Sequence, residues 1–138
     1  MSRPRIVLDT NVLISAALKP QGQQALVVYL VALGAVELFV SSEVLAEYRE
    51  VFSRPKFADL DQAAVSRLLS QVESAATMVT TTARLSISKH EPDNRFYECA
   101  EEAAADYIVT GNLKHFSQPH KSTKIITGAQ FLALIGNA

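Results

Sequence analysis

The strongest constraint on the fold is an alternation of short apolar runs with longer segments of helical pattern. Four mainly apolar runs lie at residues 6–8, 37–40, 107–109 and 124–126, and a fifth, Thr-rich run lies at residues 77–82. Short, nearly continuous apolar strands that alternate with helices are typical of a parallel sheet covered on both faces. The sequence therefore predicts an α/β fold, an α/β/α sandwich around a five-stranded parallel sheet.

The segments between the runs are predicted to be helices, from their apolar spacing and from residues that begin or end helices. The predicted helices cover residues 12–18, 23–33, 42–53, 61–76, 93–104 and 127–135. The clearest of them follows Asp61, where Val65, Leu68, Leu69 and Val72 recur at intervals of three and four residues. The first run ends directly at Asp9, which places that carboxylate at the carboxyl end of a strand.

Length and composition limit the kind of protein that this sequence can be. At 138 residues and 49% hydrophobic content, the chain is predicted to form a single domain over residues 1–138. A net charge of −1 does not favour a protein that coats nucleic acid by charge alone, so any RNA contact is expected to be local. The only cysteine, Cys99, excludes an internal disulfide and is interpreted as a core residue. No apolar stretch is long enough to span a membrane, so a cytoplasmic location is expected.

Three acidic residues stand near the expected carboxyl edge of the sheet, and each has a structural alternative. Asp9 could simply cap the first helix, and Asp93 could cap the helix that it opens. Glu47 could belong with Glu43 and Glu50 to a solvated acidic face. The functional interpretation is that all three side chains enter one cleft, because ligands bind open α/β sheets beyond the carboxyl ends of the strands.

Neutral oxygens are expected at the same edge. Thr110, Gly111 and Asn112 follow the fourth run, and the side chains of Thr110 and Asn112 offer oxygen atoms. Carboxylates with neutral oxygens suit a hard cation such as Mg²⁺ or Mn²⁺ and suit zinc or copper poorly. Such an ion serves phosphodiester hydrolysis, since it neutralises charge on phosphate oxygens and lowers the pKa of water.

The other polar residues have simpler interpretations. Asp106 precedes the fourth run, at its amino end, and is expected to be structural. The histidines share no metal-binding spacing and are interpreted as loop or surface residues: His90, His115 and His120. Four basic residues lie in or beside the loops of the expected cleft and could contact RNA phosphates or be merely solvated: Arg54, Lys56, Arg95 and Lys114.

Four segments resemble, in order, the motifs of PIN-domain proteins. They are Val7-Leu-Asp-Thr-Asn-Val-Leu-Ile-Ser15, Leu45-Ala-Glu-Tyr-Arg-Glu-Val-Phe52, Pro92-Asp-Asn-Arg-Phe96 and Ala105-Asp-Tyr-Ile-Val-Thr-Gly-Asn112. The similarity is strongest to bacterial PIN proteins that are described as toxins of toxin–antitoxin systems, relatives of the VapC type.

This resemblance implies a doubly wound fold and an endoribonuclease that depends on Mg²⁺ or Mn²⁺. It also implies a homodimer and inhibition by a cognate antitoxin protein. By motif position Asp9, Glu47 and Asp93 are the catalytic acids that hold the metal, with Asp9 and Asp93 as the expected direct ligands. Thr10 and Asn11 are expected to support Asp9 by hydrogen bonding.

The sequence departs from the family at one position. Many members have a fourth aspartate after Thr-Gly, whereas this chain has Asn112, which can bind a metal through its amide oxygen but adds no charge. This departure motivates an alternative, a catalytically weakened PIN scaffold that binds RNA or a partner protein. A phosphatase that uses the aspartate after the first strand as nucleophile is disfavoured, because Asn11 replaces the second aspartate of its usual Asp-x-Asp motif.

Overall fold

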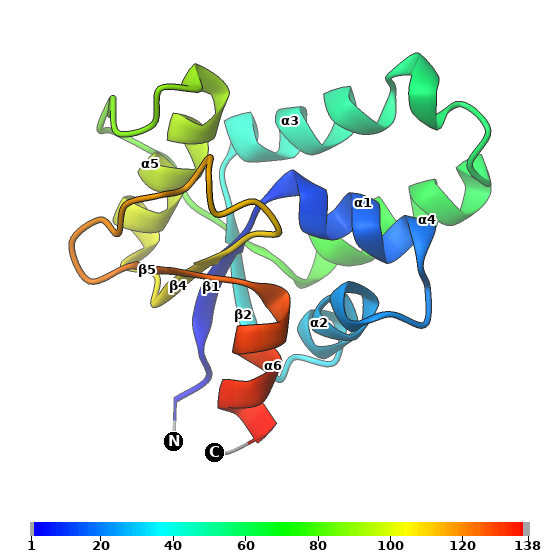
Figure 1. Ribbon diagram of the computed structural model, residues 1–138, viewed down its shortest axis with the longest axis horizontal. Helices are drawn as coiled ribbons and strands as arrows, with labels where there is room; N and C mark the ends of the chain where they lie inside the picture. The colour runs from blue at the N-terminus through cyan, green and yellow to red at the C-terminus, as the bar shows by residue number, and fades with distance from the viewer. Residues whose placement is uncertain (1, 137–138) are drawn as a thin grey trace.

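The computed structural model describes residues 2–136, and in that part of the chain six α-helices surround one five-stranded parallel sheet (Figure 1). The strands, in the sheet order β3-β2-β1-β4-β5, are β3 (Thr77–Met78), β2 (Glu37–Val40), β1 (Arg5–Leu8), β4 (Tyr107–Val109) and β5 (Lys124–Ile126). The helices are α1 (Thr10–Leu18), α2 (Gln23–Ala32), α3 (Ser42–Phe52), α4 (Gln62–Ala75), α5 (Asn94–Ala103) and α6 (Gly128–Gly136). Two short 3-10 helices are η1 (Pro55–Phe57) and η2 (Glu91–Asp93). The predicted fold class is confirmed.

The central strand β1 is buried on both faces, as its apolar sequence predicts. Ile6, Val7 and Leu8 are 0% exposed, and β1 pairs in parallel with β2 on one side and β4 on the other. Apolar, β-branched side chains suit such a strand because both of its faces pack against helices. The predicted runs 37–40, 107–109 and 124–126 coincide with β2, β4 and β5.

The third strand is shorter than predicted. We expected it over residues 77–82, but β3 ends at Met78, and its last ladder hydrogen bond runs from the Val79 amide to the Val40 carbonyl at 2.8 Å. Val40 is also the last residue of β2, the only neighbour of this edge strand. Beyond Val40 the chain turns into α3, so the Thr-rich segment has no strand left to pair with.

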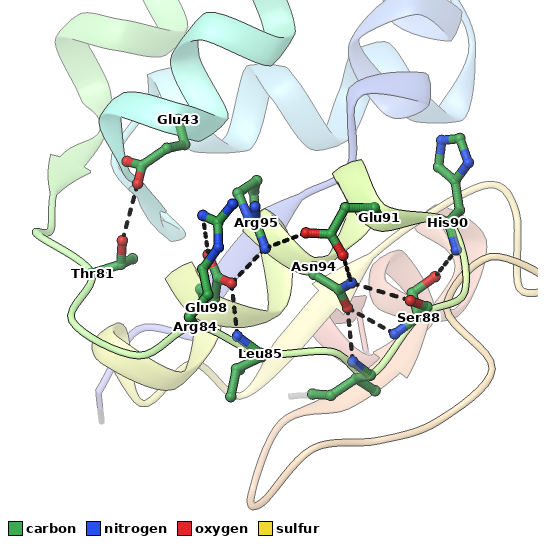
Figure 2. A network of polar contacts seen from close by, with 11 residues as sticks. Glu43, Thr81, Arg84, Leu85, Ser88, His90, Glu91, Asn94, Arg95 and Glu98 are labelled. Atoms are coloured by element: carbon green, nitrogen blue, oxygen red, sulfur yellow. Dashed lines mark hydrogen bonds and ion pairs between the residues drawn. The ribbon is translucent and has the colours of Figure 1, made fainter.

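Polar side chains of α5 hold the segment that follows β3, which has no regular structure from residue 79 to 90 (Figure 2). The Leu85 amide donates to the Glu98 carboxylate at 2.9 Å, and the Ile87 and Ser88 amides donate to Asn94 Oδ1 at 2.9 and 2.7 Å. These bonds satisfy backbone groups that a strand would otherwise satisfy. The segment is therefore fixed along α5 and leads directly into η2 and Asp93.

Three of the six α-helices begin with the expected capping chemistry. Ser41 Oγ accepts a hydrogen bond from the Val44 amide, and the Asp61 carboxylate accepts from two amides at the start of α4. Thr127 and Gln130 bond reciprocally at the start of α6, as in a capping box. The other three helices, α1, α2 and α5, have no side-chain cap bond, and α1 begins at Thr10 rather than residue 12.

The helices form one layer on each face of the sheet, and the order in which the chain adds strands changes direction at β1. α5 packs against β1, β2 and β4 on one face, whereas α1 and α2 lie on the other side of the sheet and α6 packs against α2 (Figure 1). The chain moves outward from β1 to β3 and then returns to place β4 beside β1. In sheets of this kind the crevice beyond such a reversal, at the carboxyl ends of β1 and β4, is the usual ligand site.

Two single residues behave as the sequence indicated. Cys99 lies on α5, is 0% exposed and is not in a disulfide, and burial raises the pKa of its thiol to about 12. Asp106 lies at the amino edge of the sheet, where its carboxylate accepts a hydrogen bond from the Arg5 amide at 2.9 Å. Among residues 2–136, no helix combines the length and the apolar character needed to cross a bilayer.

Candidate active site

Asp9 lies at the reversal point, immediately beyond β1. Its backbone amide donates to the Val109 carbonyl at 2.9 Å, which extends the β1–β4 pairing, and its carboxylate accepts a hydrogen bond from the Thr110 hydroxyl at 2.7 Å. The residue is 7% exposed, and no lysine or arginine of residues 2–136 pairs with it. Burial raises the pKa of Asp9 to about 6, although the Thr110 hydrogen bond opposes this rise, and the negative charge of Asp93 adds to it. Asp9 is thus a buried acid without a cation.

Asp93 is a second buried acid without a full set of partners. It ends η2 and precedes α5, it is 7% exposed, and it makes no side-chain cap bond to the helix. Its Oδ2 atom is buried and accepts no hydrogen bond from the described residues 2–136, although His115 Nδ1 lies 3.4 Å away. Burial raises the pKa of Asp93, and the neighbouring His90 and His115 lower it. The capping alternatives for Asp9 and Asp93 therefore do not describe their side chains.

Glu47 projects from α3 and is half-exposed. Burial raises its pKa, and the charges of Glu50 and Asp93 raise it further. The three acids of this helix differ in their partners: Glu50 pairs with Arg54 at 2.7 Å and Glu43 accepts from Ser42 and Thr81, but Glu47 forms no ion pair within residues 2–136. Glu47 is therefore not part of a paired acidic face.

The residues that support Asp9 are not all those predicted. The Thr110 hydroxyl, 0% exposed, bonds the Asp9 carboxylate, whereas Asn11 Oδ1 instead accepts the Gly111 amide at 3.0 Å. Thr10 acts through its backbone amide, which lowers the pKa of Asp9, and its buried hydroxyl has no partner among the described residues 2–136. Asn11 thus joins the start of α1 to the loop after β4, and Thr110 orients the acid.

Asn112 occupies a turn rather than a free position. Its amide donates to Thr110 Oγ1 at 3.0 Å, and its side-chain oxygen accepts the Lys114 amide at 3.1 Å. The side chain is half-buried. Asn112 therefore holds the Thr110 hydroxyl in place, and the oxygen that we expected to face a metal is shared with a backbone amide.

The sequence reasoning missed three residues at this edge. Tyr48 is 1% exposed, and its hydroxyl donates to the Leu8 carbonyl at 2.7 Å, which fixes α3 to the end of β1. His115 contacts Asp93 and stacks on His90 with ring centroids 5.0 Å apart. A signal was present, because His90 precedes Asp93 and His115 follows Asn112 closely in the sequence, but loop histidines without metal spacing are usually only solvated.

The donor chemistry of this edge suits a hard divalent cation. Among residues 2–136, no lysine or arginine pairs with the carboxylates of Asp9 and Asp93, and the buried Asp93 Oδ2 accepts no hydrogen bond. The negative charge of Asp93 also raises the pKa of Glu47. Mg²⁺ is often held by only one or two carboxylates together with water and substrate phosphates. Within residues 2–136, however, no three His, Cys, Asp or Glu side chains are grouped closely enough to hold a metal by themselves.

Comparison with known proteins gives consistent matches. The PIN domain family model matches residues 5–114, most of the chain. An uncharacterized protein of Methanocaldococcus jannaschii, MJ1680, is 26% identical over 110 residues, which are 78% of this chain and 70% of that protein. PAE2754 from Pyrobaculum aerophilum has a similar structure, with a TM-score of 0.65 at 16% identity, over 98% of this chain and 91% of that one.

A second solved structure has the same fold. It is VapBC2 from Rickettsia felis, bound to a DNA fragment from its promoter, with a TM-score of 0.60 at 20% identity over 88% of this chain and 98% of that one. At these identities the two solved structures show only that the fold is shared. The family of the chain is shown by the match to the PIN domain family model. The motifs that carry Asp9, Glu47, Asp93 and Asn112 all lie inside the matched range 5–114. The chain belongs to the PIN domain family.

Proposed function

We propose that this protein is a metal-dependent endoribonuclease that hydrolyses RNA phosphodiesters, and that it is the toxin of a toxin–antitoxin pair. The observation that carries the proposal is the pair of buried acids Asp9 and Asp93 near the reversal point of the sheet, which no lysine or arginine of residues 2–136 pairs with. Leaving buried carboxylates without a partner destabilises a fold, so such groups cluster where a ligand supplies the missing charge. Membership of the PIN domain family supports a nuclease.

Asp9 and Asp93 would hold Mg²⁺ or Mn²⁺, with Glu47 as a third acid and Asn112 as a neutral oxygen donor. When bound, the ion would neutralise charge on phosphate oxygens and lower the pKa of water. Asp9 is oriented for this role by the Thr110 hydroxyl at 2.7 Å. Glu47, half-exposed and with a raised pKa, is suited to accept a proton from the attacking water.

The partners follow from the same reasoning. RNA is the proposed substrate, and a cognate antitoxin protein and a second copy of the chain are the proposed protein partners, in the cytoplasm. The sequence resemblance to VapC-type toxins supports this, and so does the structural similarity to VapBC2. A small neighbouring gene that encodes a DNA-binding protein would agree with the toxin role, and its absence would leave a solitary nuclease.

A second candidate is a catalytically weakened PIN scaffold that acts by binding RNA or a partner. It is favoured by Asn112, whose side-chain oxygen accepts the Lys114 amide and carries no charge. It is also favoured by the lack of a close group of three metal-binding side chains among residues 2–136. Binding of RNA without metal-dependent cleavage would support this candidate.

The test is cleavage of a mixed RNA pool by the purified protein with Mn²⁺, compared with the variant Asp9→Asn. We expect the rate to fall by about a thousandfold in the variant, since a metal contributes several kcal/mol to stabilising the transition state. Excess EDTA should abolish cleavage by the wild type. Asp59→Asn, at an exposed aspartate before α4, is the matched control and should cleave at the wild-type rate. Equal rates for Asp9→Asn and wild type would refute the assigned mechanism.

A further inference from the structure

A pocket of about 350 Å³ lies between two loops beside the acids. We call it the loop pocket. Its walls come from residues 87–90, which precede η2, and from residues 114–118, which follow β4, and its polar lining includes Ser88, Lys89, His90, Lys114, His115 and Ser117. None of its lining residues is acidic. In a chain with a net charge of −1, this is a local concentration of cationic and hydrogen-bonding groups.

The walls of the loop pocket are fixed by hydrogen bonds to α5 and to each other. Asn94 Oδ1 accepts the Ile87 amide and also the Ser88 amide, the second of which Figure 2 shows. The Tyr97 hydroxyl donates to the Gln118 carbonyl at 2.6 Å. The Ser88 hydroxyl donates to the His115 carbonyl at 3.1 Å and so links the two loops. The pocket is therefore formed before any ligand arrives, which reduces the entropy lost on binding.

The loop pocket adjoins the proposed metal site. His115 lines it and has its Nδ1 atom 3.4 Å from Asp93 Oδ2. His90 also lines it, and its ring stacks on that of His115 with centroids 5.0 Å apart. A nucleic acid strand with one phosphate at the acids would thus have a neighbouring part of its backbone at this pocket.

The ion pairs of the molecule distinguish Lys89 and Lys114 from the two arginines near the site, Arg54 and Arg95. Arg54 pairs with Glu50, and Arg95 pairs with Glu91 and Glu98. By contrast, neither Lys89 nor Lys114 forms an ion pair with any of residues 2–136. Their charges therefore remain available for an external anion.

We propose that the loop pocket binds a backbone phosphate of the RNA strand next to the phosphate that is cleaved, through Lys89 and Lys114. This rests on the proposed function for the identity of the strand. Lysine ammonium groups, together with serine hydroxyls and imidazole N–H groups, are common partners of phosphate oxygens. Contacts of this kind position a strand without reading its sequence.

The test measures RNA binding separately from cleavage. Fluorescein-labelled single-stranded RNA is titrated with the full chain in EDTA at several NaCl concentrations, for two RNAs of unrelated sequence. For Lys89→Gln/Lys114→Gln we expect the Kd to rise about tenfold for both RNAs. The slope of log affinity against log salt should decrease by about 0.7, the value for one phosphate contact on a single strand.

Matched variants separate this site from a general effect of charge. Lys19→Gln/Lys124→Gln removes the same charge from two exposed lysines outside the loop pocket and should change the Kd much less. Lys89→Arg/Lys114→Arg should bind as the wild type does. Equal losses in both glutamine variants, a loss for only one of the RNAs, or no RNA binding by the wild type would overturn the proposal.

The same variants keep the two proposals apart when cleavage is measured with Mn²⁺. Cleavage with normal RNA binding by Lys89→Gln/Lys114→Gln would overturn the loop pocket and leave the nuclease intact. Lysine-dependent binding without any cleavage by the wild type would do the reverse. If both hold, the glutamine variant should have a raised KM with a smaller change in kcat.

Discussion

The buried acid Glu98 on α5 and the two buried acids of the candidate site, Asp9 and Asp93, differ in their partners. Glu98 is 2% exposed, and its carboxylate pairs with Arg95 at 2.7 Å and accepts the Leu85 amide at 2.9 Å (Figure 2). Arg84 lies 3.9 Å from its other oxygen. Asp9 is also buried, yet its partners are the Thr110 hydroxyl and the Thr10 backbone amide rather than an arginine or lysine, and Asp93 has a buried oxygen with no hydrogen-bond donor among the described residues.

This difference in partners shows that burial alone does not identify a functional acid. The charge of Glu98 is paired with Arg95, and its carboxylate holds the segment before η2 through the Leu85 amide. These contacts indicate a structural role for Glu98. No lysine or arginine of residues 2–136 pairs with Asp9 or Asp93, and burial raises the pKa of both carboxyls, although His90 and His115 oppose the rise at Asp93. Buried charges without a partner destabilise the folded state. A cation that binds two such carboxylates in the folded protein would offset this loss of stability.

The largest expected effect is on the paired acid. Glu98→Ala should reduce the free energy of unfolding by about 3–5 kcal/mol, because it leaves the largely buried Arg95 without its main partner and the Leu85 amide without an acceptor. Urea denaturation measures this. Glu102→Ala, at an exposed glutamate of the same helix, is the control and should change the stability by less than about 1 kcal/mol. Similar losses in the two variants would remove the contrast on which the comparison rests.

The unpaired acid should behave in the opposite way. In EDTA at pH 7, Asp9→Asn should be more stable than the wild type by up to about 3 kcal/mol, since the pKa of Asp9 rises from 3.8 to about 6 on folding and one pKa unit is worth about 1.4 kcal/mol. Asparagine can still accept the Thr110 hydrogen bond. A less stable variant at pH 7 would contradict the view that Asp9 is an uncompensated charge.

The pH dependence gives the sign of the same effect. The folded state holds the Asp9 proton more tightly than the unfolded state, so its contribution is fully present below about pH 3.8 and is lost as the pH rises through about 6. The advantage of Asp9→Asn over the wild type should therefore shrink toward zero as the pH falls from 7 to 4. Added Mn²⁺ should raise the melting temperature of the wild type but not that of Asp9→Asn.

The smallest expected effect comes from restoring the fourth acid. Asn112→Asp should lower the stability in EDTA by about 1 kcal/mol through repulsion from the existing acids, and it should tighten Mn²⁺ binding about fivefold. Calorimetric titration with Mn²⁺ measures the second effect. Gln71→Glu, which adds the same charge to an exposed position on α4, is the control. Unchanged Mn²⁺ affinity would mean that residue 112 serves only the turn in which it accepts the Lys114 amide.

The strands and most helix ends could be predicted because their causes are local. Apolar runs gave β2, β4 and β5 their observed limits, and Ser41 and Thr127 cap the helices that follow them. β3 was predicted too long because its end depends on where its neighbour β2 stops, and strand propensity alone does not contain that information. Glu98 was not identified for a similar reason: Arg95 lies on the same helix, but the Leu85 amide that Glu98 accepts comes from a segment without regular structure.

By itself, the sequence determined the fold class and which acids follow the strands and open the helices, because apolar periodicity and chain order specify both. Which of those acids have a partner for their charge depends on contacts that only the tertiary structure shows. The partner of Asp9 is Thr110, 101 residues away, and the neighbour of Asp93 is His115 across a loop. Such pairs depend on the register between β1 and β4 and on the path of the loops, and burial then sets the energy of each charge.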